Sequence, residues 1–222
     1  MGELFLIRHG ETEWSRQGKH TGRTDLPLTR LGEAQAQALQ VPLTRCHLAL
    51  ALVSPLQRAQ RTAQLAGISA CTTEPELREW DYGGCEGLTT PEIRTRQPGW
   101  SLWHDGPVPG GPGHLGETLV ELAERCERVL RRVTPLLRDT RRHQDVALVA
   151  HGHVLRVLAA RYLGLPPENA AMFTLGPASV SRLGTEHGDP AVLSWNVPAP
   201  FTQASSPSPA LASPTHRGRD TA

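Results

Sequence analysis

The chain has 222 residues, of which 38% are hydrophobic and 20% charged, and its formal net charge is +1. This length suffices for one sizeable hydrophobic core. So small a net charge means that the protein as a whole does not attract nucleic acid or an anionic membrane electrostatically. No apolar run is long enough to cross a bilayer and no signal-peptide pattern opens the chain, so we expect a cytoplasmic protein without a membrane or nucleic-acid partner.

The four cysteines give no sign of a metal or redox centre. They are Cys46, Cys71, Cys85 and Cys126, and no two of them form a C-x-x-C pair. Four cysteines in a chain of this length do not require a disulfide framework, so a reducing cytosol fits them.

The first third of the chain predicts two buried strands, each followed by a helix. Four consecutive apolar residues within Glu3 to Arg8 predict a strand buried on both faces. Thr29 is a candidate N-cap for a helix that runs through Gln40. A second buried strand is expected from Leu48 to Val53. It leads into Ser54-Pro55-Leu56-Gln57, which predicts a helix capped by Ser54 and ending near Gly67.

The middle of the chain is irregular and is followed by a long helix. Glu79 to Gly116 is rich in Gly, Pro and Trp and is predicted to be a loop with one short helix over Pro91 to Arg96. Apolar residues at three- and four-residue spacing from Leu119 to Val133 then predict a strongly amphipathic helix. Pro135 is expected to kink or end it.

The last third predicts a strand, a helix and a late pair of strands. Val146 to Ala150 reads as a third buried strand, and Val154 to Leu163 as a helix that ends before a glycine. Ala178 to Leu183 and Ala191 to Trp195 are strand candidates around a glycine-containing turn. Residues 198–222 are rich in Pro, Ala, Ser and Thr and are predicted to be a disordered tail after a single domain of residues 1–197.

Strands that alternate with helices predict an α/β fold: a three-layer sandwich with a mostly parallel central sheet and helices on both faces. In such sheets ligands bind at the carboxyl ends of the strands. His9 and His151 each follow a predicted strand, and Arg58 lies in the first turn of a helix that follows another. The three side chains are therefore expected to converge.

The segment from Leu6 to Thr12, Leu-Ile-Arg-His-Gly-Glu-Thr, resembles the signature of the histidine phosphatase superfamily, the phosphoglycerate mutase-like group. A lone Arg-His-Gly is weak evidence, but further blocks follow in the family's order and together cover about residues 4–196. These blocks are Thr21 to Thr29, Ser54 to Ala59, Leu77 to Gly83, Gly116 to Thr118 and Ala150 to His153.

The resemblance implies a phosphohistidine mechanism that the residue chemistry supports. His9 would attack phosphorus as a neutral imidazole. Arg8, Arg58 and His151 would bind the phosphoryl oxygens. Glu79 would protonate the leaving oxygen and then, as a carboxylate, activate water. Since the arginines neutralise the charge, neither a metal nor a cofactor is expected.

Eight further residues are expected to contact the substrate, and other histidines are expected to have surface or packing roles. The substrate-binding candidates are Gly10, Glu11, Thr12, Ser15, Thr21, Gly22, Tyr82 and Gly152. The histidines left out of the site are His20, His47, His104, His114, His143, His187 and His216.

Hydrolase and isomerase are the two leading hypotheses. Mutases of this family carry a longer insert after the acid, with a lysine and an arginine pair, whereas Tyr82 to Gly116 has neither. Ser15 and His153 also stand where mutases typically carry Asn. These departures favour a phosphatase, with a cofactor-dependent phosphoglycerate mutase as the alternative. A binding module that has lost the reaction is disfavoured, because all five expected catalytic residues are present.

Finer similarities suggest the substrate class. Glu11 to Ser15, Arg78 to Gly83, Glu86-Gly87 and Trp103 to Gly106 look most like a subgroup that acts on sugar phosphates. That subgroup includes fungal sedoheptulose 1,7-bisphosphatases and bacterial acid phosphatases of broad specificity. The resemblance implies a small phosphorylated sugar or carboxylic acid as substrate. The sequence leaves a homodimer open.

Overall fold

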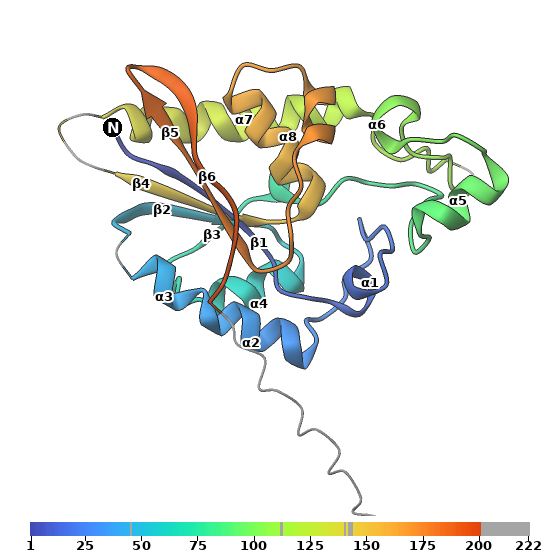
Figure 1. The fold of residues 1–222 in the computed structure, drawn as a ribbon, viewed down its shortest axis with the longest axis horizontal. Helices are drawn as coiled ribbons and strands as arrows, with labels where there is room; N and C mark the ends of the chain where they lie inside the picture. The colour runs from blue at the N-terminus through green and yellow to red at the C-terminus, as the bar shows by residue number, and fades with distance from the viewer. Residues whose placement is uncertain (45, 112, 140, 142–143, 201–222) are drawn as a thin grey trace, which may run out of the picture.

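A computed structural model describes residues 1–44, 46–111, 113–139, 141 and 144–200 (Figure 1). Most of the predicted tail therefore lies outside the described residues, as do His143 and His216. The boundary between domain and tail stays a prediction, although the last strand runs through Pro198, which the sequence had assigned to the tail.

Within the described residues, the centre of the fold is a six-stranded sheet of order β3-β2-β4-β1-β5-β6. Strands β1 to β4 pair in parallel with one another, while β5 runs antiparallel to β1 and forms a hairpin with β6. The mostly parallel sheet predicted from the sequence is thus confirmed. The strands are β1 (Leu4–Arg8), β2 (Leu48–Val53), β3 (Thr72–Thr73), β4 (Asp145–Ala150), β5 (Ser179–Glu186) and β6 (Asp189–Pro198).

Helices cover both faces of the sheet, as predicted: α7 and α8 lie on one face, and α2, α3 and α4 on the other (Figure 1). The helices are α1 (Glu13–Arg16), α2 (Arg30–Ala38), α3 (Gln40–Leu43), α4 (Gln57–Leu65), α5 (Thr90–Arg96), α6 (Leu102–Asp105), α7 (Leu119–Arg138) and α8 (Gly152–Tyr162). Two short 3₁₀ helices span Pro75–Leu77 and Pro167–Met172. No helix among these residues is long and apolar enough to cross a membrane.

Strand β1 shows why its apolar residues are continuous rather than alternating. Leu4 and Leu6 belong to the core under α7 and α8, whereas Phe5 and Ile7 belong to the core over α2, α3 and α4. All four are buried, and burying each stabilises the fold by about 1.5–3 kcal/mol. The two cores hold β1 in register beside β4, which fixes where the residues after both strands lie.

The carboxyl ends of β1, β2 and β4 meet at one edge of the sheet. The backbone N–H of His9, just after β1, donates to Ala150 at the end of β4 at 3.0 Å. The N–H of Ser54, just after β2, donates to Val149 of β4 at 3.0 Å. The predicted convergence of loops is therefore built from parallel pairing.

Two predicted helix starts are wrong, and of the two alternatives given for Pro135, the end of the helix is excluded. The helix after β2 starts at Gln57 with Leu56 as N-cap, because the backbone of Leu56 is extended. The hydroxyl of Ser54 accepts from the N–H of Leu56 at 3.3 Å and also lies 2.7 Å from Nε2 of His151. Helix α7 continues past Pro135 to Arg138, since proline removes only one helical hydrogen bond while Leu137 stays buried in the core. Helix α8 begins two residues earlier than predicted, directly after His151.

The loop predicted after Glu79 contains more structure than expected. Helix α5 confirms the predicted short helix, but α6 was not predicted, nor were α1 and β3. These elements have at most seven residues, and α1 and α6 have only four, too few for a hydrophobic period to be visible in sequence. The predicted strands after Gly176 form a hairpin that turns at His187 and Gly188, both with positive φ.

Candidate active site

His9 lies at the end of β1 with its two ring nitrogens in different surroundings. Nδ1 is 2.7 Å from the backbone oxygen of Gly10, so Nδ1 carries the hydrogen. Nε2 has no hydrogen-bond partner among the described residues and keeps its lone pair. Burial and the nearby charges of Arg58 and Arg8 lower the pKa of His9 well below its usual value. The ring is therefore neutral and nucleophilic at Nε2.

Arg8, next to His9, has one donor without an acceptor. Its Nη1 donates to the backbone oxygen of Leu175, but its buried Nε has no partner in the part of the chain that the structure describes. Burial lowers the pKa of Arg8, and the charge of Glu79 opposes that effect. An unsatisfied buried guanidinium N–H is costly, so this donor is suited to an anion bound from outside.

Arg58 and His151 form a fully buried pair that does not line the cavity described below. Nε of Arg58 donates to Nδ1 of His151 at 3.0 Å, so the hydrogen of His151 is on Nε2, 2.7 Å from the hydroxyl of Ser54. Burial and then the charge of Arg58 lower the pKa of His151 well below its usual value. Arg58 also donates to the backbone oxygens of residues 21, 22 and 24.

This pairing leaves fewer donors for a phosphoryl group than the sequence predicts. Arg58 has five N–H donors, and it donates four hydrogen bonds to acceptors within the protein. His151 has both ring nitrogens engaged, while its ring lies 5.1 Å from that of His9. To donate to a phosphoryl oxygen, His151 must exchange the Ser54 hydroxyl for it.

Glu79 is buried, and three backbone amides hold its carboxylate. Oε1 accepts from Trp80 and Val154 at 2.9 Å each, and Oε2 accepts from His153 at 3.0 Å. Two of these amides belong to the first turn of α8, whose positive end favours a carboxylate. The helix that follows His151 therefore also fixes the position of Glu79.

Gly152 lies between these groups. A Cβ atom added to it would be 3.5 Å from Nε of Arg8 and 3.7 Å from Oε2 of Glu79. The unpartnered arginine donor and the carboxylate thus border the same space. That space belongs to a cavity of about 290 Å³, whose walls include Arg8, His9, Glu79 and Gly152.

Three more of the predicted substrate-binding residues line this cavity. Ser15 and Thr21 lie on its wall, with hydroxyls also bound to the backbone oxygens of Thr12 and Lys19. Tyr82 lies there too, and its hydroxyl is 2.6 Å from Nδ1 of His153. These three residues therefore share a cavity with His9, and their contact with a substrate stays a prediction.

The other four predicted substrate-binding residues do not line the cavity, because they are engaged in contacts with other parts of the protein. Gly10 packs against Gly32, where an added Cβ would be 2.3 Å from a backbone oxygen. Glu11 accepts from the hydroxyl of Thr29 at 2.8 Å. Thr12 caps α1 and is fully buried, and the amide of Gly22 donates to Glu86. Their contacts shape the loop rather than the cavity wall.

Seven wall residues were left out of the predicted site: Gly18, Lys19, His20, Thr90, His153, Arg156 and Leu175. His20 was assigned a surface or packing role, yet its ring lies 4.9 Å from that of Tyr82. Arg156 lies one helical turn after Gly152, a spacing that could have revealed it. It donates to Ala170 and Ala171 backbone oxygens, and burial lowers its pKa.

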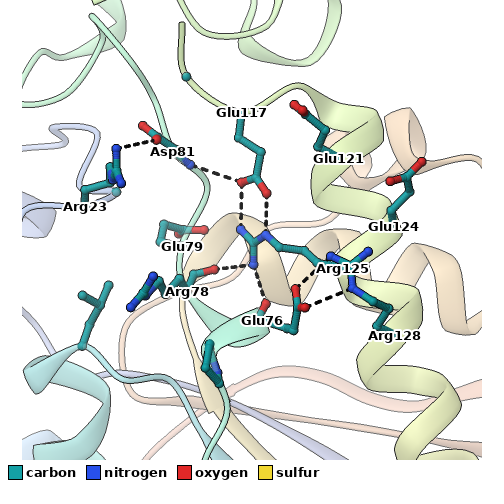
Figure 2. Close-up of a pocket in the computed structure, with 14 residues that line it drawn as sticks. Arg23, Glu76, Arg78, Glu79, Asp81, Glu117, Glu121, Glu124, Arg125 and Arg128 are labelled. Atoms are coloured by element: carbon teal, nitrogen blue, oxygen red, sulfur yellow. Dashed lines mark hydrogen bonds and ion pairs between the residues drawn. The ribbon is translucent and has the colours of Figure 1, made fainter. Parts of the chain in front are cut away.

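A buried ion pair supports the segment that carries Glu79 (Figure 2). Arg125 of α7 donates to both oxygens of Glu117, at 2.5 and 2.9 Å. Its Nη1 also donates to the backbone oxygens of Glu76 and Arg78. The indole of Trp80 in turn donates to the backbone oxygen of Glu117 at 2.6 Å. We call Arg125 and Glu117 the brace, since they bind the chain on both sides of Glu79.

The brace borders a second cavity of about 730 Å³, which is lined by paired charges (Figure 2). Arg128 pairs with Glu76, and Arg23 with Asp81. In the described part of the chain, no group of three or more His, Cys, Asp or Glu side chains is arranged to hold a metal ion.

Comparison with known proteins places this site in a family. The family model of the histidine phosphatase superfamily (branch 1) matches residues 4–198. An acid phosphatase of Mycobacterium tuberculosis is 37% identical, over 83% of this chain and 87% of that protein. Sedoheptulose 1,7-bisphosphatase of Saccharomyces cerevisiae is 33% identical, over 72% of this chain and 67% of that protein. A probable phosphoglycerate mutase GpmB of Proteus mirabilis is 31% identical, over 88% and 90%.

A solved structure shows the same fold. The product of the Rv3214 open reading frame of Mycobacterium tuberculosis superposes with a TM-score of 0.79 at 34% identity, over 89% of this chain and 98% of that one. Sequence, fold and the geometry around His9 agree. The chain is a member of the histidine phosphatase superfamily.

Proposed function

We propose that this protein is a phosphomonoester hydrolase of small phosphorylated metabolites, in which His9 carries the phosphoryl group. One observation carries the proposal. The backbone oxygen of Gly10 binds the Nδ1 hydrogen of His9, so Nε2 is left as a neutral, unpartnered nucleophile. The same cavity is lined by Arg8, whose buried Nε has no partner in the described structure. The similar acid phosphatase of Mycobacterium tuberculosis supports hydrolysis as the outcome.

In the first step, Nε2 of His9 would attack phosphorus while the ester P–O bond breaks. The leaving oxygen would take a proton from Glu79, whose Oε2 borders the same space as Arg8. The products are phosphohistidine, the free alcohol and the Glu79 carboxylate. His9 does not need to lose its Nδ1 hydrogen, because the backbone oxygen of Gly10 accepts it and stabilises the positive charge that develops on the ring.

In the second step, water would replace the alcohol. The Glu79 carboxylate would accept a proton from that water as its oxygen attacks phosphorus and the P–N bond breaks. Inorganic phosphate leaves, and His9 returns to its neutral form. The three amides that donate to the Glu79 carboxylate keep it in position between the two steps.

The phosphoryl oxygens would be bound by Nε of Arg8, by Arg58 and by His151. Arg8 offers the donor that has no partner in the described structure. Arg58 lies fully buried and adds positive charge in a site that excludes water. His151 would contribute its Nε2 hydrogen after exchanging the hydroxyl of Ser54.

A small sugar phosphate or bisphosphate is the substrate that we propose. The cavity of about 290 Å³ has room for a compact metabolite rather than a polymer, and its wall includes Ser15, Thr21 and Lys19. The similar yeast sedoheptulose 1,7-bisphosphatase supports this class. The proposal also includes a cytoplasmic location and no nucleic-acid or membrane partner, while the homodimer stays a prediction.

A phosphoglycerate mutase is the second candidate. The probable phosphoglycerate mutase GpmB of Proteus mirabilis covers most of this chain. In the structure, Lys19 and Arg156 give the cavity wall two cations that could hold a second anionic group. A mutase would return the phosphoryl group to another hydroxyl of its substrate instead of to water.

The deciding experiment is a screen of phosphorylated sugars and phosphorylated carboxylic acids, in which phosphate release and 3-phosphoglycerate isomerisation are measured side by side. We expect phosphate release from at least one sugar phosphate, and isomerisation at a rate at least 100-fold lower. The His9→Ala variant is the control and should show neither activity. Isomerisation that exceeds hydrolysis would assign the mutase instead.

A further inference from the structure

His153 lies on the cavity wall among aromatic side chains and has no role in the steps above. It is the second residue of α8 and follows Gly152. Its ring centroid is 5.2 Å from that of Trp103, 5.6 Å from Tyr82 and 6.0 Å from Trp80. About 21% of its side chain is exposed. The ring is therefore held by packing while part of it remains open to the cavity.

The hydroxyl of Tyr82 fixes the position of one hydrogen on this ring. The hydroxyl lies 2.6 Å from Nδ1 of His153 and has no other acceptor among the described residues. Burial raises the pKa of Tyr82 well above its usual value, so the phenol keeps its hydrogen. Because that hydrogen needs an acceptor, Tyr82 donates to Nδ1 and the ring hydrogen of His153 lies on Nε2.

His153 is an uncharged donor. Burial lowers its pKa well below the usual value, and the charges of Arg156 and His20 lower it further. Nδ1 is 3.9 Å from Oε2 of Glu79, too far for a hydrogen bond, so the carboxylate does not hold a proton on the ring.

Nε2 of His153 is available to a bound molecule. No hydrogen bond joins it to any residue that the structure describes, and it is not among the fully buried side-chain atoms that lack a partner. Because His153 lines the cavity, this N–H can meet a substrate there. The same wall contains Ser15 and Thr21, which are suited to hydroxyl groups.

We propose that His153 is a specificity-determining residue, which donates its Nε2 hydrogen to an oxygen of the alcohol part of the substrate and so selects polyhydroxylated phosphate esters over plain alkyl phosphates. The proposal rests on the phosphatase function proposed above. A neutral donor suits a hydroxyl, because it does not compete with Arg8 and Arg58 for the charged phosphoryl group. Tyr82 positions the ring by holding its tautomer.

The test compares glycerol 1-phosphate with propyl phosphate, which have the same carbon skeleton and differ only in hydroxyl groups. The unmodified enzyme should show the higher kcat/KM for glycerol 1-phosphate. His153→Phe keeps an aromatic ring but has no donor, and we expect the ratio of the two kcat/KM values to fall about tenfold, the effect of losing one hydrogen bond. The loss should appear chiefly in KM for glycerol 1-phosphate.

Two further variants separate recognition from structural damage. His153→Gln retains an N–H donor and should recover part of the ratio, whereas His104→Phe, on the exposed surface of α6, should leave it unchanged. Tyr82→Phe should give an intermediate ratio. Nitrogen-15 spectra of His153 should then change from the Nε2–H tautomer to a mixture.

Each outcome bears on the proposal. Equal losses for both substrates in His153→Phe, or an unmodified enzyme without preference for glycerol 1-phosphate, would overturn it, as would an Nδ1–H signal in the unmodified protein. Failure of the phosphatase function looks different, since no phosphate would then be released from any ester, while the spectra would still report the tautomer.

Discussion

The reactivity of His9 depends on backbone and charge around one side chain. Gly10 holds the hydrogen on Nδ1, while Arg8 and Arg58 disfavour a second proton. Glu79 is the complementary group, with its carboxylate held by three amides. The two side chains come from different segments, yet both line the cavity that Gly152 also borders.

At this scale, Glu79→Gln tests the proposed acid. Glutamine keeps the size of the side chain but cannot donate a proton to the leaving oxygen. We expect kcat to fall about 100- to 10,000-fold for an alkyl phosphate and far less for p-nitrophenyl phosphate, whose leaving group needs little protonation. Steady-state kinetics with both esters measure the difference. Equal losses would exclude Glu79 as the acid.

Gly152→Ala tests whether the space beside Arg8 is where the phosphoryl group binds. The new methyl would lie 3.5 Å from Nε of Arg8, in the space of the substrate rather than in a clash with the backbone. We expect KM to rise about tenfold or more, with the melting temperature nearly unchanged, since alanine favours a helix.

Gly164→Ala, at the other end of α8, is the matched control. Gly164 has φ of +73° and open space around it, so alanine there should lower stability by about 1 kcal/mol and leave KM unaltered. If Gly152→Ala behaves in the same way, the space beside Arg8 is not the phosphoryl site.

At the scale of elements, α7 and α8 both hold Glu79, one through the brace and one through its amino end. Arg125→Met breaks the brace and leaves Glu117 without its partner. A fully buried pair costs about 3–5 kcal/mol of unfolding free energy when one partner is removed. The Glu117 side chain is 17% exposed, so we expect a smaller loss that still exceeds that of an exposed pair. The loss of kcat should also be larger for an alkyl phosphate than for p-nitrophenyl phosphate, because the acid loses its position.

Arg128→Met is the control for the brace, on the same helix and in the same cavity (Figure 2). Its pair with Glu76 is half-exposed, and such pairs contribute about 0–1 kcal/mol. Denaturant unfolding and kinetics of both variants measure the contrast. Similar effects of the two substitutions would show that the brace does not position Glu79.

The helices and strands that the sequence predicted best are those with a long hydrophobic pattern. β1, β2, β4 and α7 have continuous apolar runs or a sustained helical period, and each was located within about two residues at its start. The failures have local causes: Ser54 had the residue type of a helix cap, but the backbone of Leu56 is extended and the helix starts at Gln57. Pattern alone could not show that conformation.

Topology explains which of the site residues the sequence alone brings together. His9, Arg58 and His151 follow strands, so topology alone brings them together. The loop that brings Lys19 and His20 to the cavity has no spacing pattern that would reveal them in the sequence. Arg156 has one such signal, because it lies one helical turn after Gly152. Glu11 and Thr12 belong to the motif, but their side chains stabilise the loop.

At the scale of the whole molecule, buried neutral histidines make stability depend on pH. His9, His151 and His153 have pKa values well below their usual value of 6.5 in the folded protein. Below that pH the unfolded chain binds protons that the folded chain does not, so stability falls as the pH falls. Each histidine should contribute a slope of about 1.4 kcal/mol per pH unit until its folded pKa is reached.

His153→Gln isolates one of these contributions. Denaturant unfolding between pH 7 and about pH 5 should show a shallower slope in the variant, by up to one proton. The difference between the two proteins cancels the effects of carboxylates that titrate in both. An identical slope would mean that His153 is not neutral and buried as the structure places it.

Trapping the phosphoenzyme shows whether the phosphoryl group passes through His9. Rapid acid-free quenching with a ³²P-labelled substrate, followed by peptide mapping, should find a label that is stable in alkali, labile in acid and attached to His9. His9→Ala should bind no label and release no phosphate while retaining its fold. Label on any other residue, or turnover by the His9→Ala variant, would contradict the account.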